Sequence, residues 1–135
     1  MAKAAGDTTQ SSSSNEVGAY TTTAKSAIQT MLGVENGVTF VETVSGTTPS
    51  ITGEPNTVYY CGEVSSITIA PPAVGTVDVR FTSGTTATVL TVTPPTGVTA
   101  VKWPGWFDSS SLETSTIYEI IITNGEFGGV MTWAS

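Results

Sequence analysis

The sequence contains no histidine, and this absence removes several kinds of chemistry at once. Ser-His-Asp and Cys-His catalysis, histidine proton relays and histidine metal sites all require an imidazole. Cysteine occurs once, at Cys61, so a disulfide within one chain is excluded. Cys61 follows Tyr60 in an apolar run with no neighbour that would lower the thiol pKa, so we expect a buried and inert side chain.

Charged residues are scarce, and cations are especially so. The chain holds 4 Lys and Arg against 11 Asp and Glu, a net charge of −7, and only 11% of its residues are charged. Phosphate binding needs clustered Lys and Arg, so we expect no nucleic-acid partner. Ordinary domains carry about 25% charged residues. The low fraction favours a protein that hides much of its surface in an oligomer or a larger assembly.

Long hydrophobic runs are also missing. None approaches the roughly 20 apolar residues of a membrane span, and the N-terminus lacks the apolar core of a secretory signal. We therefore expect synthesis in the cytoplasm and no membrane partner. No phosphate-binding loop or EF-hand is present, so we expect no metal or cofactor. The acids that could in principle pair for glycosidase chemistry, for which we expect solvated or structural roles, are Glu54, Glu63, Glu113 and Glu119.

The residues that are abundant favour strands. Thr occurs 26 times and, with Val and Ile, dominates the chain; these β-branched residues suit sheets. The strongest local signal is residues 116–133, where Asn124-Gly125 separates two β-rich runs and predicts a type I′ hairpin. Gly128-Gly129 predicts a bulge or bend in the return strand. A final strand this apolar requires a sheet to join.

Residues 49–135 are expected to form that sheet as one unit. Further strands are predicted at 38–44, 57–61, 63–69, 76–81, 86–92 and 98–101, with Gly62 as a bulge and 45–56 as a loop. Residues 76–92 are predicted to form a second hairpin. This pattern predicts a mainly β fold, an antiparallel β-sandwich or jelly-roll-like knob.

Residues 1–48 predict an attachment region. Residues 1–19 are too polar to fold alone and form either a disordered leader or an extended anchoring arm. Residues 20–48 form a short helix and a neck, the helix covering 24–32 with Gly33 as its cap. Its apolar stripe, which would pack on the sheet or around a trimer axis, consists of Ala24, Ala27, Ile28, Met31 and Leu32.

One aromatic cluster is a candidate binding site. Trp103, Trp106 and Phe107 precede Asp108, and exposed indole faces stack on sugar rings while a carboxylate accepts hydroxyl hydrogen bonds. The alternative is that these rings close the end of the sandwich or pack at a subunit interface. Burial is the commoner role of Trp, which favours the alternative.

Four strings carry a family resemblance: TGEPNTVYYCGEV (52–64), VRFTSGT (79–85), VKWP (101–104) and YEI (118–120). Their order resembles the C-terminal β-modules of small bacteriophage virion proteins, namely head-fibre, decoration, and tail-fibre or baseplate subunits. The similarity covers about residues 53–133, and the helix before it is similar to the short necks of such modules. The resemblance implies a homotrimer and does not distinguish capsid from tail. The segment that precedes the module, residues 1–48, is too short for a fibre shaft.

These observations predict a non-enzymatic virion structural protein. We expect a trimeric capsid head-fibre or decoration protein on the virion surface, held to capsid or tail proteins by residues 1–19. The first alternative is a tail-fibre or baseplate receptor-binding protein that recognises host surface glycans. The second is a small carbohydrate-active enzyme, which the missing histidine disfavours.

Overall fold

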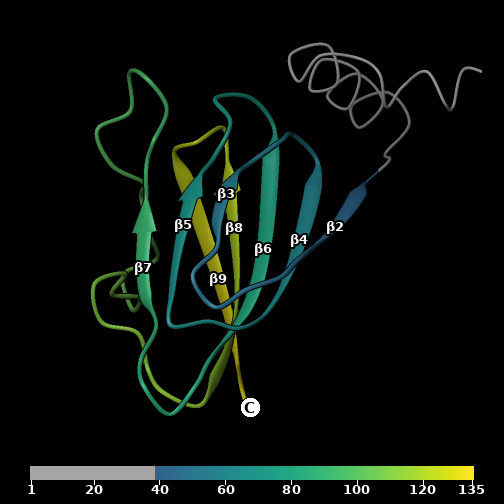
Figure 1. Cartoon of the computed structure of the whole chain (residues 1–135). Coiled ribbons are helices and arrows are strands. Elements are labelled where there is room, and N and C mark those ends of the chain that lie inside the picture. The colour runs from purple at the N-terminus through teal and green to yellow at the C-terminus, as the bar shows by residue number, and fades with distance from the viewer. Residues whose placement is uncertain (1–38) are drawn as a thin grey trace, which may run out of the picture.

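The computed structural model of the protein describes residues 39–135, which form eight strands in two sheets and contain no helix (Figure 1). The first sheet has the order β2-β4-β6-β8-β9 and the second the order β3-β5-β7. The strands of the first are β2 (Phe40–Val44), β4 (Thr57–Glu63), β6 (Thr76–Ser83), β8 (Thr116–Thr123) and β9 (Phe127–Ala134). Those of the second are β3 (Ser50–Thr52), β5 (Ser66–Ala70) and β7 (Val89–Val92). The predicted arm and helix lie outside the described residues.

The chain alternates between the two sheets as it runs from β2 to β8. Each return to a sheet adds a strand parallel to the one before, so β2, β4 and β6 are parallel, and so are β3, β5 and β7. Among residues 39–135, only β8 and β9 add antiparallel pairings. The prediction of a mainly β fold is confirmed. The expectation that the sheets are antiparallel throughout is wrong: the five-stranded sheet is mixed and the three-stranded sheet is parallel, because the chain crosses to the other sheet where a hairpin would have turned back.

The core lies between the two sheets. Val77, Val79 and Phe81 of β6 point inward together with alternate residues of β8, while Ile67 and Ile69 reach them from β5. Full burial of each such side chain contributes roughly 1.5–3 kcal/mol. The period-2 pattern of β6 therefore sets which of its residues are buried, as the sequence predicts.

The carboxyl-terminal hairpin forms as predicted. β8 and β9 pair over their full length, and Asn124 and Gly125 have φ angles of 54° and 66°, the positive values that a type I′ turn requires. The Asn124 side chain accepts a hydrogen bond from the Gly75 N–H at 3.0 Å. The Asn124 N–H donates to the Gly75 carbonyl at 2.8 Å. Two hydrogen bonds thus connect the turn to the loop that leads into β6.

The predicted second hairpin, residues 76–92, is wrong. β6 and β7 belong to different sheets, and the corner between them is fixed by two buried hydroxyl groups. Ser83 Oγ accepts from the Thr88 N–H at 3.0 Å, and Thr88 Oγ1 donates to the Val64 carbonyl at 2.7 Å. These bonds turn the chain away from β6 and toward the second sheet.

Four smaller expectations have mixed outcomes. The irregularity expected at Gly62 is confirmed by a register shift between Tyr60 and Glu63. The bulge expected at Gly128-Gly129 is absent, because β8 and β9 pair there without interruption. Residues 98–101 form no strand, and only Lys102 makes an isolated bridge, to Phe127. The second sheet also takes β3 from the segment predicted as a loop.

Candidate functional site

Four aromatic rings form a continuous path from the core to the surface. Phe81 stacks on Tyr118 with ring centroids 5.5 Å apart. Phe107 meets Tyr118 edge-on at 6.2 Å, and Trp106 meets Phe107 edge-on at 5.8 Å. The Trp106 side chain is 64% exposed, so the path ends in a ring that solvent can reach. A rigid, exposed indole of this kind is suited to stacking on a flat or cyclic ligand.

Trp103 begins the same loop but has a different environment. It is half-buried and packs edge-on against Phe107 at 5.1 Å. The backbone beside it is held to the start of β9, since the Lys102 N–H donates to the Glu126 carbonyl and the Gly128 N–H donates to the Lys102 carbonyl. The expectation of buried packing therefore describes Trp103, and the expectation of an exposed ring describes Trp106.

Asp108 lies at the exposed tip of this loop. Its Oδ1 accepts hydrogen bonds from the Ser110 N–H at 2.9 Å and the Ser110 hydroxyl at 2.6 Å. These bonds, to the side chain and then to the backbone of Ser110, hold the pKa of Asp108 below its ordinary value. The carboxylate is therefore charged at neutral pH and able to accept hydrogen bonds from a ligand.

A hollow of about 230 Å³ brings three of the four predicted contact residues together. Trp106, Phe107 and Asp108 line it with Ser111, Glu113 and Tyr118. The Tyr118 hydroxyl accepts from the Glu113 N–H at 2.8 Å, which fixes the floor. An exposed ring, two acids and a serine can together stack on a sugar and accept its hydroxyl hydrogen bonds.

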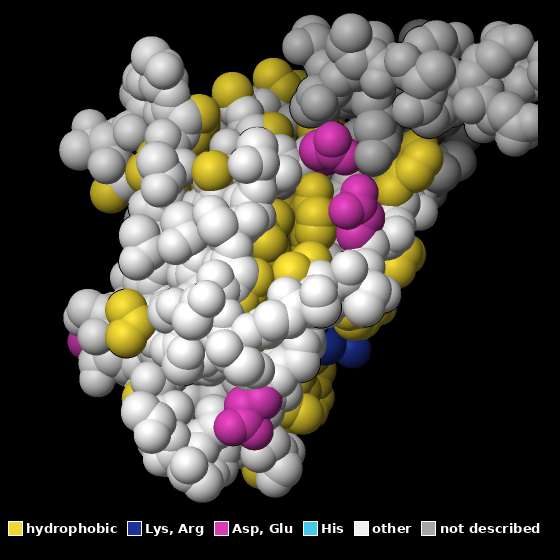
Figure 2. All heavy atoms as spheres, viewed as in Figure 1, with side chains coloured by type: hydrophobic (Ala, Val, Ile, Leu, Met, Phe, Trp, Pro, Cys, Tyr) yellow, Lys and Arg dark blue, Asp and Glu magenta, His cyan; other side chains and the backbone are white. Residues whose placement is uncertain are grey.

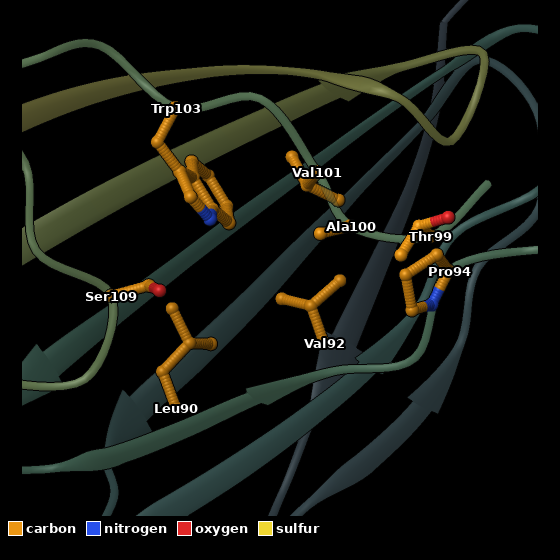
Figure 3. A pocket seen from close by; sticks show the side chains of 8 residues that line it. All are labelled: Leu90, Val92, Pro94, Thr99, Ala100, Val101, Trp103 and Ser109. Atoms are coloured by element: carbon orange, nitrogen blue, oxygen red, sulfur yellow. The ribbon is translucent and has the colours of Figure 1, made fainter.

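A second hollow, of about 250 Å³, lies on the other side of Trp103. Figure 3 shows Leu90 and Val92 of β7 on one side of this space and Trp103 and Val101 on the other. Its lining is completed by Pro94, Thr99, Ala100 and Ser109. The side chains that line this space are mostly apolar, with the hydroxyl groups of Thr99 and Ser109 among them.

A third hollow, of about 300 Å³, opens between β2 and β3 and contains one of the predicted acids, Glu54. Tyr59 accepts a hydrogen bond there from the Glu54 N–H at 3.0 Å, and burial raises the pKa of Tyr59 to about 12. On the side that Figure 2 shows, acidic groups are few, and uncharged white and yellow atoms make up most of the described surface. The sparse charge expected from composition is visible there.

Sequence reasoning missed one electrostatic cluster, on the side of the five-stranded sheet that faces away from the core. Arg80 Nη2 donates to Glu119 Oε1 at 3.0 Å. Burial first, and then the Glu119 carboxyl, raise the pKa of Asp78 to about 7. The hydrogen bond from Asp78, followed by that from Arg80, lowers the pKa of Glu119. Below the Asp78 pKa of about 7 the two carboxyls therefore share one proton, held on Asp78.

This acid pair differs from a glycosidase pair. In those enzymes a sugar fits between carboxyls that are roughly 5 Å or more apart, whereas the Asp78 and Glu119 carboxyls are close enough for each to shift the pKa of the other. The alternation of β6 did place Asp78 and Arg80 on an outward side. Their meeting with Glu119 depends on the register of β6 against β8, in which Arg80 is opposite Glu119.

The outward side of the five-stranded sheet otherwise carries apolar side chains and threonines, and we call its central part the outer face. Val41 is 63% exposed, Met131 and Trp133 are each 45% exposed, and Tyr60 is 39% exposed. The register places these side chains around the acid pair. The outer face consists of Val41, Thr43, Val58, Tyr60, Asp78, Arg80, Ile117, Glu119, Ile121, Met131 and Trp133.

The remaining predicted residues have simple environments. Cys61 packs partly against the core, and burial raises its thiol pKa. Glu63 lies beside Gly84 at one end of the sheet. Ala24, Ala27, Ile28, Met31 and Leu32, the trimer-helix candidates, lie outside the described residues.

Among residues 39–135, no three His, Cys, Asp or Glu side chains are grouped so as to hold a metal ion. The same part of the chain has no helix with the length and apolar character to cross a membrane. Comparisons of the chain with models of protein families, with curated proteins and with solved structures find no match. The function must therefore be argued from the residues themselves.

Proposed function

We propose that this chain is a bacteriophage virion structural protein, a homotrimeric head-fibre or decoration protein on the capsid. The observation that best supports the proposal is the outer face, where large apolar side chains are exposed side by side on a sheet. Exposed contiguous apolar surface marks a site that another molecule covers. The low charge of the whole chain, 11% of residues, is suited to the same role.

Residues 1–19 are the proposed attachment to the virion. They are rich in Ser and Thr, and when extended they span about 60 Å at roughly 3.3 Å per residue. An extended arm binds a groove through main-chain hydrogen bonds and the fit of small side chains. Three arms in one trimer add avidity even where each contact is weak.

Deleting residues 1–19 tests the attachment. The truncated chain is expected to keep its oligomeric state and melting temperature while losing incorporation into particles, measured by blotting purified virions. The control carries the amino acids of positions 1–19 in shuffled order, which separates sequence-specific binding from tethering by any polar tail. Full occupancy by the truncated chain would show that attachment runs through another part of the protein.

The second candidate function is recognition of host surface glycans by a tail-fibre or baseplate protein. The hollow beside the exposed Trp106 ring favours it, because Asp108 and Glu113 stand at the same place as acceptors for sugar hydroxyls. Trp106→Ala should abolish signals on a glycan array while leaving the melting temperature within a degree of wild type. An array with no signal for the wild-type chain would leave the decoration role as the better proposal.

A further inference from the structure

At the centre of the outer face, Arg80 and Asp78 each have a polar atom without a hydrogen-bond partner among the described residues. The Arg80 guanidinium lies between two aromatic rings, 5.3 Å from the Tyr60 centroid and 5.5 Å from the Trp133 centroid. One of its hydrogen-bonding groups is used on Glu119, but Arg80 Nε and Asp78 Oδ1 have neither solvent contact nor a partner within the described residues. Buried polar atoms without partners destabilise a protein. The part of Arg80 that a partner can reach is the exposed 40% of its side chain, which lies between the two rings.

The rings on both sides of Arg80 come from two different strands, Tyr60 from β4 and Trp133 from β9. Trp133 is opposite Ile117, and Met131 is opposite Glu119, so the apolar rows of β8 and β9 continue the surface beyond the ion pair. Val41 continues it on the other side, opposite Val58. A flat apolar surface with a central Arg and flanking aromatic rings has the composition of an interface centre.

Charge indicates which partner fits. Among residues 39–135 there are 2 cations and 8 acids, 2 − 8 = −6, so most surfaces of two copies would repel each other. Below the Asp78 pKa of about 7 the outer face is different, because one cation faces two acids that share a proton, 1 − 1 = 0. Copies of the chain can therefore meet through this face without net repulsion.

The residues that precede the described part of the chain connect to a strand of the outer face. Residues 1–38 lead into β2, the edge strand that carries Val41 on the outer face. The predicted helix ends at residue 32, and the short link from there to residue 39 spans at most about 25 Å. Helices that associated as the sequence predicts would hold the outer faces of their own copies close together.

We infer that the outer face is the surface through which copies of this chain dock on one another, with Tyr60, Arg80 and Trp133 at its centre. The inference rests on the proposed homotrimer and assigns it a surface. The affinity between docked copies also depends on pH. Above the pKa of Asp78 each face has a net charge of 1 − 2 = −1, and apposed faces then repel in a medium of low dielectric.

The groups that face Asp78 are few and can be named. Glu119 reaches it from β8, Arg80 from β6 itself, and the Tyr60 hydroxyl from β4 is the remaining titratable group on this face. The edge strands β2 and β9 contribute Val41, Met131 and Trp133, which do not titrate. Among these groups, the Asp78–Glu119 pair changes charge near neutral pH.

Two valines with the same exposure give a matched test. Val41 and Val89 are each 63% exposed and lie on the edge strands β2 and β7 of different sheets, but only Val41 belongs to the outer face. Val41→Glu and Met131→Glu in the full chain should raise the dissociation constant of the oligomer about tenfold or more by sedimentation equilibrium, as expected for a charge buried without a partner. Val89→Glu should leave it unchanged.

The proton dependence gives the second measurement. Wild-type association should weaken between about pH 6 and about pH 8, on either side of the Asp78 pKa of about 7, and Asp78→Asn should remove that dependence. A trimer that tolerates Met131→Glu and Val41→Glu would overturn this assignment while leaving the virion role intact. A wild-type chain that stays monomeric at micromolar concentration would overturn both the assignment and the trimer. Loss of virion incorporation tests the proposed function separately.

Discussion

The indole of Trp103 lies directly against the backbone of Gly128. A Cβ atom placed on Gly128 would be 2.5 Å from Trp103 Cε3 and 2.6 Å from Cζ3, closer than real Cβ contacts. This glycine therefore makes room for a side chain, which explains why β9 remains regular where two adjacent glycines predicted a bulge. Through this contact the loop that carries Trp106 and Asp108 packs against the hairpin of β8 and β9.

Gly128→Ala should destabilise the protein by about 1–3 kcal/mol, since the added methyl group must displace the indole or the strand. Gly129→Ala is the matched control, because a Cβ atom there meets nothing within 4 Å. Urea denaturation of the two variants measures the difference. Equal midpoints would contradict the close packing of Trp103 on β9.

Gly125→Ala should cost more than Gly97→Ala. Both glycines have positive φ angles, 66° and 93°, so both substitutions carry backbone strain. Only Gly125 adds a clash, because a Cβ atom added there would lie 2.4 Å from Pro95 Cγ, whereas Gly97 is open. The expected difference in the free energy of unfolding is on the order of 1–3 kcal/mol. If thermal melting gives the same loss for both, the turn is free to move away from Pro95.

Thr88→Val should destabilise the protein by about 1–3 kcal/mol, because it leaves the Val64 carbonyl without the hydroxyl donor at the corner between the two sheets. Thr86→Val is a control in the same turn, where the side chain is exposed. Chemical denaturation should show a loss for Thr88→Val alone. A neutral Thr88→Val would mean that apolar packing, not this hydrogen bond, directs the chain to the second sheet.

Stability should fall as the pH rises toward neutrality. The pKa of Asp78 is raised from 3.8 to about 7 in the folded protein, so the folded state binds this proton more tightly than the unfolded chain. The contribution of this proton to the free energy of unfolding is complete below about pH 4. It is lost as the pH rises through 7, a change on the order of 1–3 kcal/mol. Glu119, with its lowered pKa, adds an opposite slope only below about 4.5.

The corresponding measurement is the urea midpoint at pH values from about 5 to about 8, which bracket the Asp78 pKa of about 7. Asp78→Asn keeps a hydrogen-bond donor toward Glu119 and should give a flat profile. Asp108→Asn, at an exposed acid whose pKa is lowered, should retain the wild-type slope. A slope that survives Asp78→Asn would assign the proton to another group.

Local signals in the sequence predicted the local parts of the fold. Asn124-Gly125 specifies its own turn, and the alternation of residues 76–81 identifies which side chains of β6 are buried. Periodicity reports which face of a strand is inward and says nothing about which strand lies beside it. For that reason β6 and β7 resembled a hairpin, although the buried Ser83 and Thr88 direct them to separate sheets.

The candidate site was predictable to the same degree. Trp106, Phe107 and Asp108 are neighbours in the sequence, so a single turn of the chain is enough to place them around one hollow. Glu113 and Tyr118 complete it from farther along the chain. The triad of Asp78, Arg80 and Glu119 depends on the pairing of two strands that are distant in the sequence, with Arg80 and Glu119 separated by 39 positions. No spacing rule connects residues at that distance.

The alternation between sheets makes this architecture extensible. Phe40 pairs with Thr57 in one sheet and Ser50 pairs with Thr68 in the other, so the winding advances both sheets by nearly the same length of chain. Within residues 39–135, β2 and β3 are the edge strands at which the winding begins, so one more turn of similar length placed before β2 could pair with an edge strand in each sheet. Each inserted turn would add about 4.8 Å of height, the spacing between neighbouring strands. The carboxyl-terminal hairpin of β8 and β9 lies at the opposite edge of the five-stranded sheet and would be unchanged. The number of strands could therefore vary without altering that hairpin.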